Sequence, residues 1–182
     1  MGDSAGDTSS NTGAAAETAL RDTTAEAAAD VAPLDAAPAP AGGPARVRVQ
    51  RRVEWAQTDA AGHHHWSAVL HWAEEAETVL HERLGIAHRT FGREPRVHVR
   101  VDFTGRLYFR DLVEIEIAVR EVGRSSARYT FTVTRAGDTA ASGELVAAYV
   151  DLDSGRAAPW PQDIRDALTT GGEQLPELVG AG

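Results

Sequence analysis

The sequence predicts an α+β fold in which a curved antiparallel sheet wraps around one long helix. Apolar residues recur with helical spacing from Trp66 to Leu84. One strand-like stretch precedes this segment and four follow it. In these stretches apolar and polar residues alternate, or apolar residues form a continuous run. Short turns join the last four, and short connections favour antiparallel pairing. A single helix with one apolar face is then expected to pack on the concave face of the sheet.

The first strand is expected to begin near Arg46, where Val47, Val49, Val53 and Trp55 alternate with polar residues. Residues 86–95 contain Gly92 and Pro95 and are interpreted as a loop. The later strands are placed at about 97–103, 113–120, 128–134 and 140–150. The last of these lacks a polar face after Leu145, which predicts that both of its faces are covered. A short helix from about Pro161 to Leu168 would close the fold.

The long helix has one apolar and one polar side. The apolar side carries Trp66, Val69, Leu70, Ala73, Ala76, Leu80 and Leu84, and the polar side carries His71, Glu74, Glu75, Thr78 and Glu82. Gly85 stands where a left-handed residue would end the helix. The helix is therefore predicted to run from Trp66 to Leu84, with its N-terminus directly after a polar turn.

Composition limits the classes of protein to consider. The chain has 182 residues, of which 42% are hydrophobic, which suits one domain with a buried core. It has no cysteine, so disulfides, a thiolate nucleophile and cysteine metal sites are excluded. The absence of disulfides is typical of cytoplasmic proteins, and a cytoplasmic location is expected. The formal net charge of -9 argues against nucleic-acid binding. No apolar run approaches membrane-spanning length.

Three regions are predicted along the chain. Residues 1–44 are rich in Ala, Pro and acidic residues and poor in large aliphatics, so they are expected to form a disordered acidic tail without a secretory signal. Residues 45–169 form the folded domain, and residues 170–182 are expected to be a flexible end.

The turn before the helix holds the residues expected to carry chemistry, Asp59 and the run His63, His64 and His65. An aspartate in this position is usually a turn former or a cap, although Asp59 lies several residues before the first helical position. The free N–H groups and the dipole at the helix N-terminus suit a thioester or phosphate oxygen. Three consecutive histidines point in different directions and lack a carboxylate at ligand spacing, so no metal site is expected.

The turn resembles that of a known family. Asp59-Ala60-Ala61-Gly62-His63, preceded by Arg52-Val53-Glu54-Trp55 and followed by a Trp-Ala-Glu-Glu-Ala helix, is similar to the hotdog-fold acyl-CoA thioesterases of the 4-hydroxybenzoyl-CoA thioesterase type. The similarity extends from about Arg46 to Leu168 and implies the hotdog fold. Gln57 and Trp66 depart from the family pattern, and the bulk of Trp66 favours an aromatic or otherwise flat acyl group.

The resemblance implies roles for individual residues. Asp59 would be the nucleophile toward the thioester carbonyl or the base for a water molecule, and the backbone amide of Trp66 would hold the oxyanion. His63 would orient the loop, with Gly62, His64 and His65 beside the substrate. In another hotdog branch the reacting carboxylate comes from the helix, and here it would be that of Glu74 or Glu75. Arg106, Arg110, Arg124 and Arg128 are candidates by residue type for phosphate contacts.

The leading hypothesis is hydrolysis of an acyl thioester on coenzyme A or on an acyl carrier protein, releasing free acid and thiol. No cofactor is expected beyond the coenzyme A or phosphopantetheine of the substrate. Hotdog thioesterases build their sites between subunits, which implies a homodimer or homotetramer. Two alternatives are a hotdog hydratase or dehydratase, with His63 or His65 as acid-base partner, and a non-catalytic protein that binds acyl thioesters.

Overall fold

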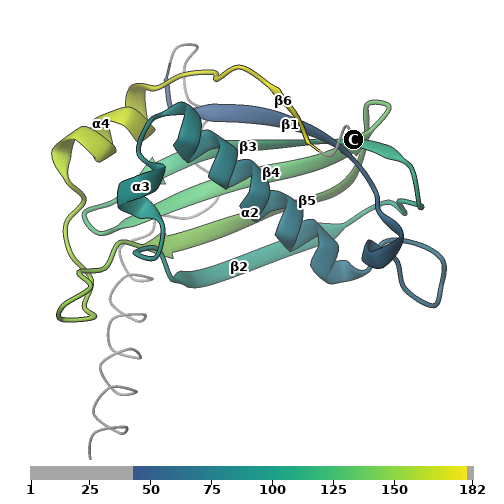
Figure 1. Ribbon diagram of the computed structural model, residues 1–182, viewed down its shortest axis with the longest axis horizontal. Helices are drawn as coiled ribbons and strands as arrows, with labels where there is room; N and C mark the ends of the chain where they lie inside the picture. The colour runs from purple at the N-terminus through teal and green to yellow at the C-terminus, as the bar shows by residue number, and fades with distance from the viewer. Residues whose placement is uncertain (1–42, 180–182) are drawn as a thin grey trace, which may run out of the picture.

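The computed structural model describes residues 43–179, and residues 1–42 of the expected tail lie outside this range. Its sheet is built from β1 (Arg46–Arg52), β2 (Arg96–Phe103), β3 (Leu112–Val122), β4 (Ser126–Arg135), β5 (Asp138–Ala148) and β6 (Glu177–Val179). Its helices are η1 (Trp55–Gln57), α2 (Trp66–Arg83), α3 (Ala87–Thr90) and α4 (Gln162–Thr170). The long helix α2 crosses one face of the sheet, with the η1 turn at one end and α3 and α4 at the other (Figure 1).

The six strands form one sheet in the order β2-β5-β4-β3-β1-β6. All neighbours pair antiparallel except β1 and β6, which are parallel. The register aligns Ile117 with Phe131 and Tyr129 with Leu145, so the large apolar residues of the central strands share the face that α2 covers. The predicted antiparallel sheet around one long helix is confirmed.

The apolar side of α2 faces the sheet, as predicted, with Val69, Ala73, Ala76 and Leu80 completely buried. Trp72 was not assigned to that side, yet it is also fully buried. The expectation that Trp66 is buried is wrong, because its side chain at the start of the helix is 60% exposed. Gly85 has φ of 71°, the left-handed conformation predicted for the end of the helix.

The connections on either side of α2 differ from their predicted form. The first strand ends at Arg52 and is followed by the 3-10 turn η1, which leaves Trp55 74% exposed instead of half-buried. The segment interpreted as a loop after α2 begins with the one-turn helix α3. Both changes are local, and neither alters the path of the chain around the core.

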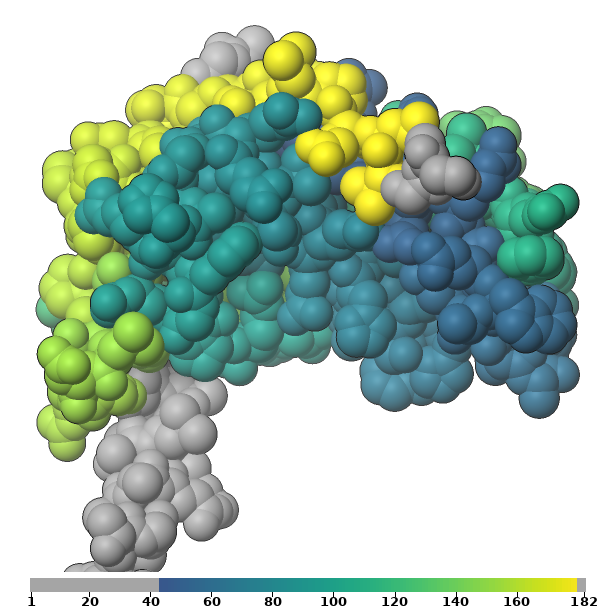
Figure 2. Space-filling view, viewed as in Figure 1, coloured from purple at the N-terminus to yellow at the C-terminus, as the bar shows by residue number. Residues whose placement is uncertain are grey.

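The C-terminal segment returns across the sheet after α4, whose Ile164 and Leu168 are buried. Strand β6 then pairs with β1 through residues 177–179, inside the stretch expected to be flexible. This strand was not predicted, because its three residues are too few to show alternation. In Figure 2 the C-terminal segment lies beside α2 on the face of the molecule that carries the helix.

The second face of β5 is also buried, as predicted. Residues 145–150 are all buried, and Glu144 next to them is only 2% exposed. Glu144 forms an ion pair with Arg128 of β4, which is itself buried. No helix in the described part of the chain is long and apolar enough to cross a bilayer.

Candidate active site

The turn between η1 and α2 is organised by its own hydrogen bonds around Asp59. The Asp59 N–H donates to the His63 carbonyl at 3.0 Å, and Oδ1 accepts the Ala61 N–H at 2.8 Å. Gly62 has φ of 79° in this turn, a conformation that other residues adopt only with strain. Oδ2 lies 3.9 Å from Nδ1 of His63 and accepts no hydrogen bond from any residue the structure describes. One carboxylate oxygen therefore holds the turn while the other remains available.

His64 fastens this turn to the loop that follows β2. Its backbone N–H donates to the Leu107 carbonyl at 2.7 Å, and the Leu107 N–H donates to Nδ1 at 3.1 Å. The ring is buried with its centroid 6.2 Å from that of Trp72 and 6.0 Å from that of Phe103. Burial lowers the pKa of His64, which favours the neutral ring that this hydrogen bond requires.

The N-terminus of α2 opens beside the turn, with His65 as its capping residue. Nδ1 of His65 accepts the Ser67 N–H at 3.3 Å, and the His65 carbonyl accepts the Ala68 N–H at 2.9 Å. As the first residue of the helix, Trp66 has no intrahelical partner for its N–H. The cap thus satisfies the next two amides and leaves the Trp66 amide at the positive end of the helix dipole.

A cavity of about 390 Å³ brings the turn and the helix tip together. Its lining comes from the turn, the first helical residue and the end of β2 with the loop beyond it, and consists of Asp59, His63, His64, Trp66, Phe103, Thr104, Gly105 and Arg106. The carboxylate and the first helical residue predicted to act together therefore line one pocket. Its walls include the large rings of Trp66 and Phe103, which are 60% and 47% exposed.

The structure separates the remaining predicted site residues. His65 serves as the helix cap and Gly62 shapes the turn, and neither lines this cavity. Arg106 does line it, whereas Arg110 stacks on the ring of Phe109 at 5.6 Å in the loop before β3. Arg128, another candidate by residue type for a phosphate contact, does not line the cavity, and its guanidinium is buried against Glu144.

Phe103, Thr104 and Gly105 were not predicted as site residues. They belong to the end of β2 and the loop after it, far from Asp59 in the sequence, and alternation predicts a strand without showing what its end approaches. Glu74 and Glu75, the alternative carboxylates, do not line the Asp59 cavity. Glu75 pairs with Arg51, and Glu74 lies 3.9 Å from Nε of Arg96.

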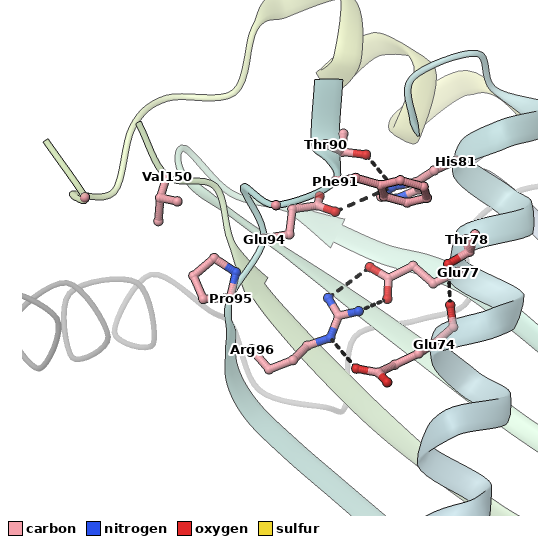
Figure 3. Close-up of a pocket in the computed structure, with 12 residues that line it drawn as sticks. Glu74, Glu77, Thr78, His81, Thr90, Phe91, Glu94, Pro95, Arg96 and Val150 are labelled. Atoms are coloured by element: carbon pink, nitrogen blue, oxygen red, sulfur yellow. Dashed lines mark hydrogen bonds and ion pairs between the residues drawn. The ribbon is translucent and has the colours of Figure 1, made fainter. Parts of the chain in front are cut away.

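A second and larger cavity, of about 650 Å³, lies at the opposite end of α2. Glu77 and His81 face it from the helix and Glu94 from the loop before β2, with Arg96 paired to Glu77 (Figure 3). A smaller cavity of about 190 Å³ between α2 and β2 is lined by Trp66 at one end and by Glu74 and Arg96 at the other. The three cavities thus follow one side of α2 from the Asp59 turn to this cluster.

Burial dominates the ionisation of this cluster. It raises the pKa of Glu77 to about 7 and that of Glu94 to about 8. It lowers the pKa of His81 to about 4, because the charged ring would lose its solvation. The cluster was not predicted, because the spacing of four residues between Glu77 and His81 on the helix does not show that Glu94 lies beside them.

Comparison with known families identifies the superfamily of the chain. The model of the Thioesterase-like superfamily matches residues 53–168, and the chain belongs to this superfamily. A 1,4-dihydroxy-2-naphthoyl-CoA hydrolase from Synechococcus elongatus is 26% identical over 125 residues, which cover 65% of this chain and 92% of the relative. The predicted resemblance to hotdog thioesterases is confirmed.

Solved structures show the same fold. A thioesterase from Thermus thermophilus complexed with coenzyme A and Zn superposes with a TM-score of 0.62 at 28% identity, covering 66% of this chain and 90% of that one. A 1,4-dihydroxy-2-naphthoyl-CoA thioesterase from Synechocystis has a TM-score of 0.62 at 19% identity, covering 68% and 95%. The family match and these relatives together support thioester hydrolysis as the activity of the chain.

Proposed function

We propose that the chain hydrolyses aromatic acyl-CoA thioesters in the cavity lined by Asp59, Trp66 and Phe103. The observation that carries this proposal is the shared cavity itself, in which a carboxylate oxygen without a hydrogen-bond partner among the described residues meets the first residue of a long helix. A thioester carbonyl needs an attacking or activating group on one side and hydrogen-bond donors at its oxygen.

Oδ2 of Asp59 supplies the first requirement. As a nucleophile it attacks the carbonyl carbon, and collapse of the tetrahedral intermediate expels the thiolate and leaves a mixed anhydride that water hydrolyses. As a base it removes a proton from the water that attacks the same carbon. Oδ1 remains bound to the Ala61 N–H in either case, which keeps the carboxylate fixed while Oδ2 reacts.

The Trp66 N–H supplies the second requirement, because negative charge develops on the carbonyl oxygen as either attack proceeds. An amide at the helix tip stabilises that charge without reorganising, and the helix dipole adds to its effect. The two hydrogen bonds between His64 and Leu107 hold the Asp59 turn against the loop that follows β2.

The aromatic walls support an aryl acyl group. Trp66 and Phe103 expose large ring surfaces at the cavity, and a flat acyl ring gains more from stacking on them than an alkyl chain does. The Synechococcus relative is named for a naphthoyl thioester of coenzyme A, which is aromatic. Coenzyme A is the proposed carrier, with an acyl carrier protein as the alternative to be tested beside it.

A homodimer through β2 is part of the proposal. This strand is an edge of the sheet, and its Val99 and Phe103 are 42% and 47% exposed. An edge strand with exposed apolar residues is a template for pairing with another chain. A second copy on this edge would cover the side of α2 along which the cavities lie, and would complete the wall of the Asp59 cavity.

Release of free thiol from a panel of thioesters tests the function. The panel contains benzoyl-CoA, 4-hydroxybenzoyl-CoA, hexanoyl-CoA and benzoyl carrier protein, with crotonyl-CoA hydration followed in parallel. The proposal expects the highest kcat/KM for an aryl-CoA. Comparable rates for hexanoyl-CoA would refute the preference for aryl groups. A higher rate on benzoyl carrier protein would refute coenzyme A as the carrier, and hydration without thiol release would refute hydrolysis.

Light scattering during size-exclusion chromatography measures the mass of the assembly, and the mass of a monomer would contradict the proposed homodimer.

A further inference from the structure

The polar cluster at the far end of α2 joins three metal-ligating side chains from two segments. Glu77 and His81 are four residues apart and therefore lie on the same side of the helix. Glu94 reaches them from the loop between α3 and β2 (Figure 3). One ligand atom from each of the three lies within 4.8 Å of the other two. His81 Nδ1 is 3.5 Å from Oε2 of Glu94.

The cluster is buried and incompletely satisfied. The side chains of Glu77, His81 and Glu94 are 4%, 1% and 8% exposed. Oε1 of Glu94 is buried without a hydrogen-bond partner among the residues the structure describes. A buried carboxylate oxygen has given up its hydrogen bonds to water, and without a new partner that loss destabilises the folded chain. A hydrogen-bond donor or a cation bound at Oε1 of Glu94 would remove this cost.

The charges on the cluster leave room for a cation. Arg96 pairs with both oxygens of Glu77 and approaches Glu74, so one guanidinium faces three carboxylates once Glu94 is counted. Ligation of a metal ion requires Glu77 and Glu94 to be deprotonated, and with all three carboxylates ionised beside one guanidinium the group carries two uncompensated negative charges. A divalent cation would balance them, and it would give Oε1 of Glu94 the partner it lacks.

We propose that Glu77, His81 and Glu94 form a binding site for a divalent transition-metal ion, with Zn²⁺ or Mn²⁺ as the occupant. Two carboxylates and one imidazole suit these ions better than Mg²⁺ or Ca²⁺, which prefer oxygen ligands alone. The site lies outside the Asp59 cavity and does not depend on the proposed hydrolysis.

The groups around the ligands are arranged as supporting partners. Nε2 of His81 lies 3.1 Å from the Tyr129 hydroxyl, which accepts the ring N–H when Nδ1 is the metal ligand. Thr90 Oγ1, 2.9 Å from Nδ1, also lies 3.5 Å from the Ala87 carbonyl. Its proton can turn to that carbonyl, which leaves an oxygen lone pair directed at the ion. The cavity of about 650 Å³ provides the route from solvent.

Bound metal would fasten the loop of Glu94 to α2. Glu94 stands two residues before Arg96, the first residue of the edge strand β2. Metal binding by Glu94 would therefore fix the start of β2 relative to α2. This end of α2 lies opposite the Asp59 turn. The ion has a positioning role in this account and takes no part in the chemistry.

Isothermal titration of chelator-treated full-length protein with Zn²⁺, and separately with Mn²⁺ and Mg²⁺, tests the site. One Zn²⁺ per chain is expected, with a dissociation constant in the micromolar range or tighter, and Glu94→Gln should weaken it at least about a hundredfold. The matched control is His71→Asn, which removes an exposed histidine beside Glu74 on the same helix and should leave the affinity unchanged. Equal affinity of the wild type and Glu94→Gln would overturn the proposal, as would the absence of saturable binding.

A second measurement uses the wild-type protein alone and does not depend on how the variant folds. Crystals soaked in Zn²⁺ and measured at the zinc absorption edge should show an anomalous peak between Glu77, His81 and Glu94. Peaks confined to the exposed histidines would overturn the proposal. Thermal melting should agree with the titration, because added Zn²⁺ raises the Tm of the wild type and of His71→Asn but not that of Glu94→Gln.

Discussion

Replacing His64 with Phe should loosen the attachment of the Asp59 turn while preserving the packing of the ring. A phenyl ring keeps the contacts with Trp72 and Phe103 but cannot accept the Leu107 N–H. Leu107 is fully buried, so its N–H would lose its partner in a place that water does not reach. Leaving a buried donor unsatisfied costs about 1 to 3 kcal/mol. For a chain of this size each kcal/mol lowers the Tm by roughly 2–4 °C.

The matched control is His64→Asn, whose side-chain oxygen takes a position close to that of Nδ1. Asn can accept the Leu107 N–H and does not titrate, so this variant should recover much of the stability that Phe loses. Urea unfolding followed by circular dichroism at pH 7.5 measures both variants. If His64→Phe unfolded at the same urea concentration as the wild type, loss of the hydrogen bond to the Leu107 N–H would cost nothing and the hydrogen-bond account would be refuted.

The pH dependence gives an independent check on the same residue. The pKa of His64 is lower in the folded chain than in the unfolded chain, because burial disfavours the charged ring. Its contribution to stability is therefore present above the unfolded pKa, about 6.5, and is lost as the pH falls below it. The gap in unfolding free energy between the wild type and His64→Phe should narrow from pH 7.5 to pH 5. A constant gap would show that the ring does not titrate as described.

Three further substitutions test other parts of the structure. Gly62→Ala places a Cβ at φ of 79° and should cost about 1 to 2 kcal/mol in urea unfolding, whereas an unchanged midpoint would show that the turn can relax. Gly143→Ala puts a Cβ against the Arg100 carbonyl and 2.5 Å from the Phe131 ring, so it should lower the Tm by several degrees, and a retained Tm would contradict this packing. Phe103→Ala should raise KM for benzoyl-CoA about fivefold or more, in keeping with about 1 kcal/mol for an aromatic pair, but leave hexanoyl-CoA nearly unaffected. Equal effects on both substrates would argue against a ring-binding wall.

The fold could be predicted from the sequence because its main elements carry strong local patterns. The alternation around Val47 and Val49 and the helical spacing from Val69 to Leu80 are both properties of neighbouring residues. Trp66 shows the limit of such patterns. It has the correct spacing for the buried side of α2, but it stands at the helix tip, where the structure has a cavity and the side chain is exposed.

The site could be predicted only in part, for the same physical reason. Asp59 and Trp66 lie in one motif, so their meeting at the helix tip follows from local structure. Phe103 reaches the same cavity through the pairing of β2 with β5, which no local pattern specifies. Glu94 and His81 likewise meet only because the chain folds back after α3.

The most direct test of the account is the rate of thiol release from the best aryl-CoA substrate by Asp59→Asn. This change keeps the size of the side chain and an oxygen that can accept the Ala61 N–H, but it removes the carboxylate charge on which either role depends. The account predicts that kcat falls by about 10²- to 10⁴-fold with an unchanged fold. Turnover within a factor of about two of the wild type, too small a change to reflect loss of a general base, would contradict the assignment of Asp59 as the reacting carboxylate.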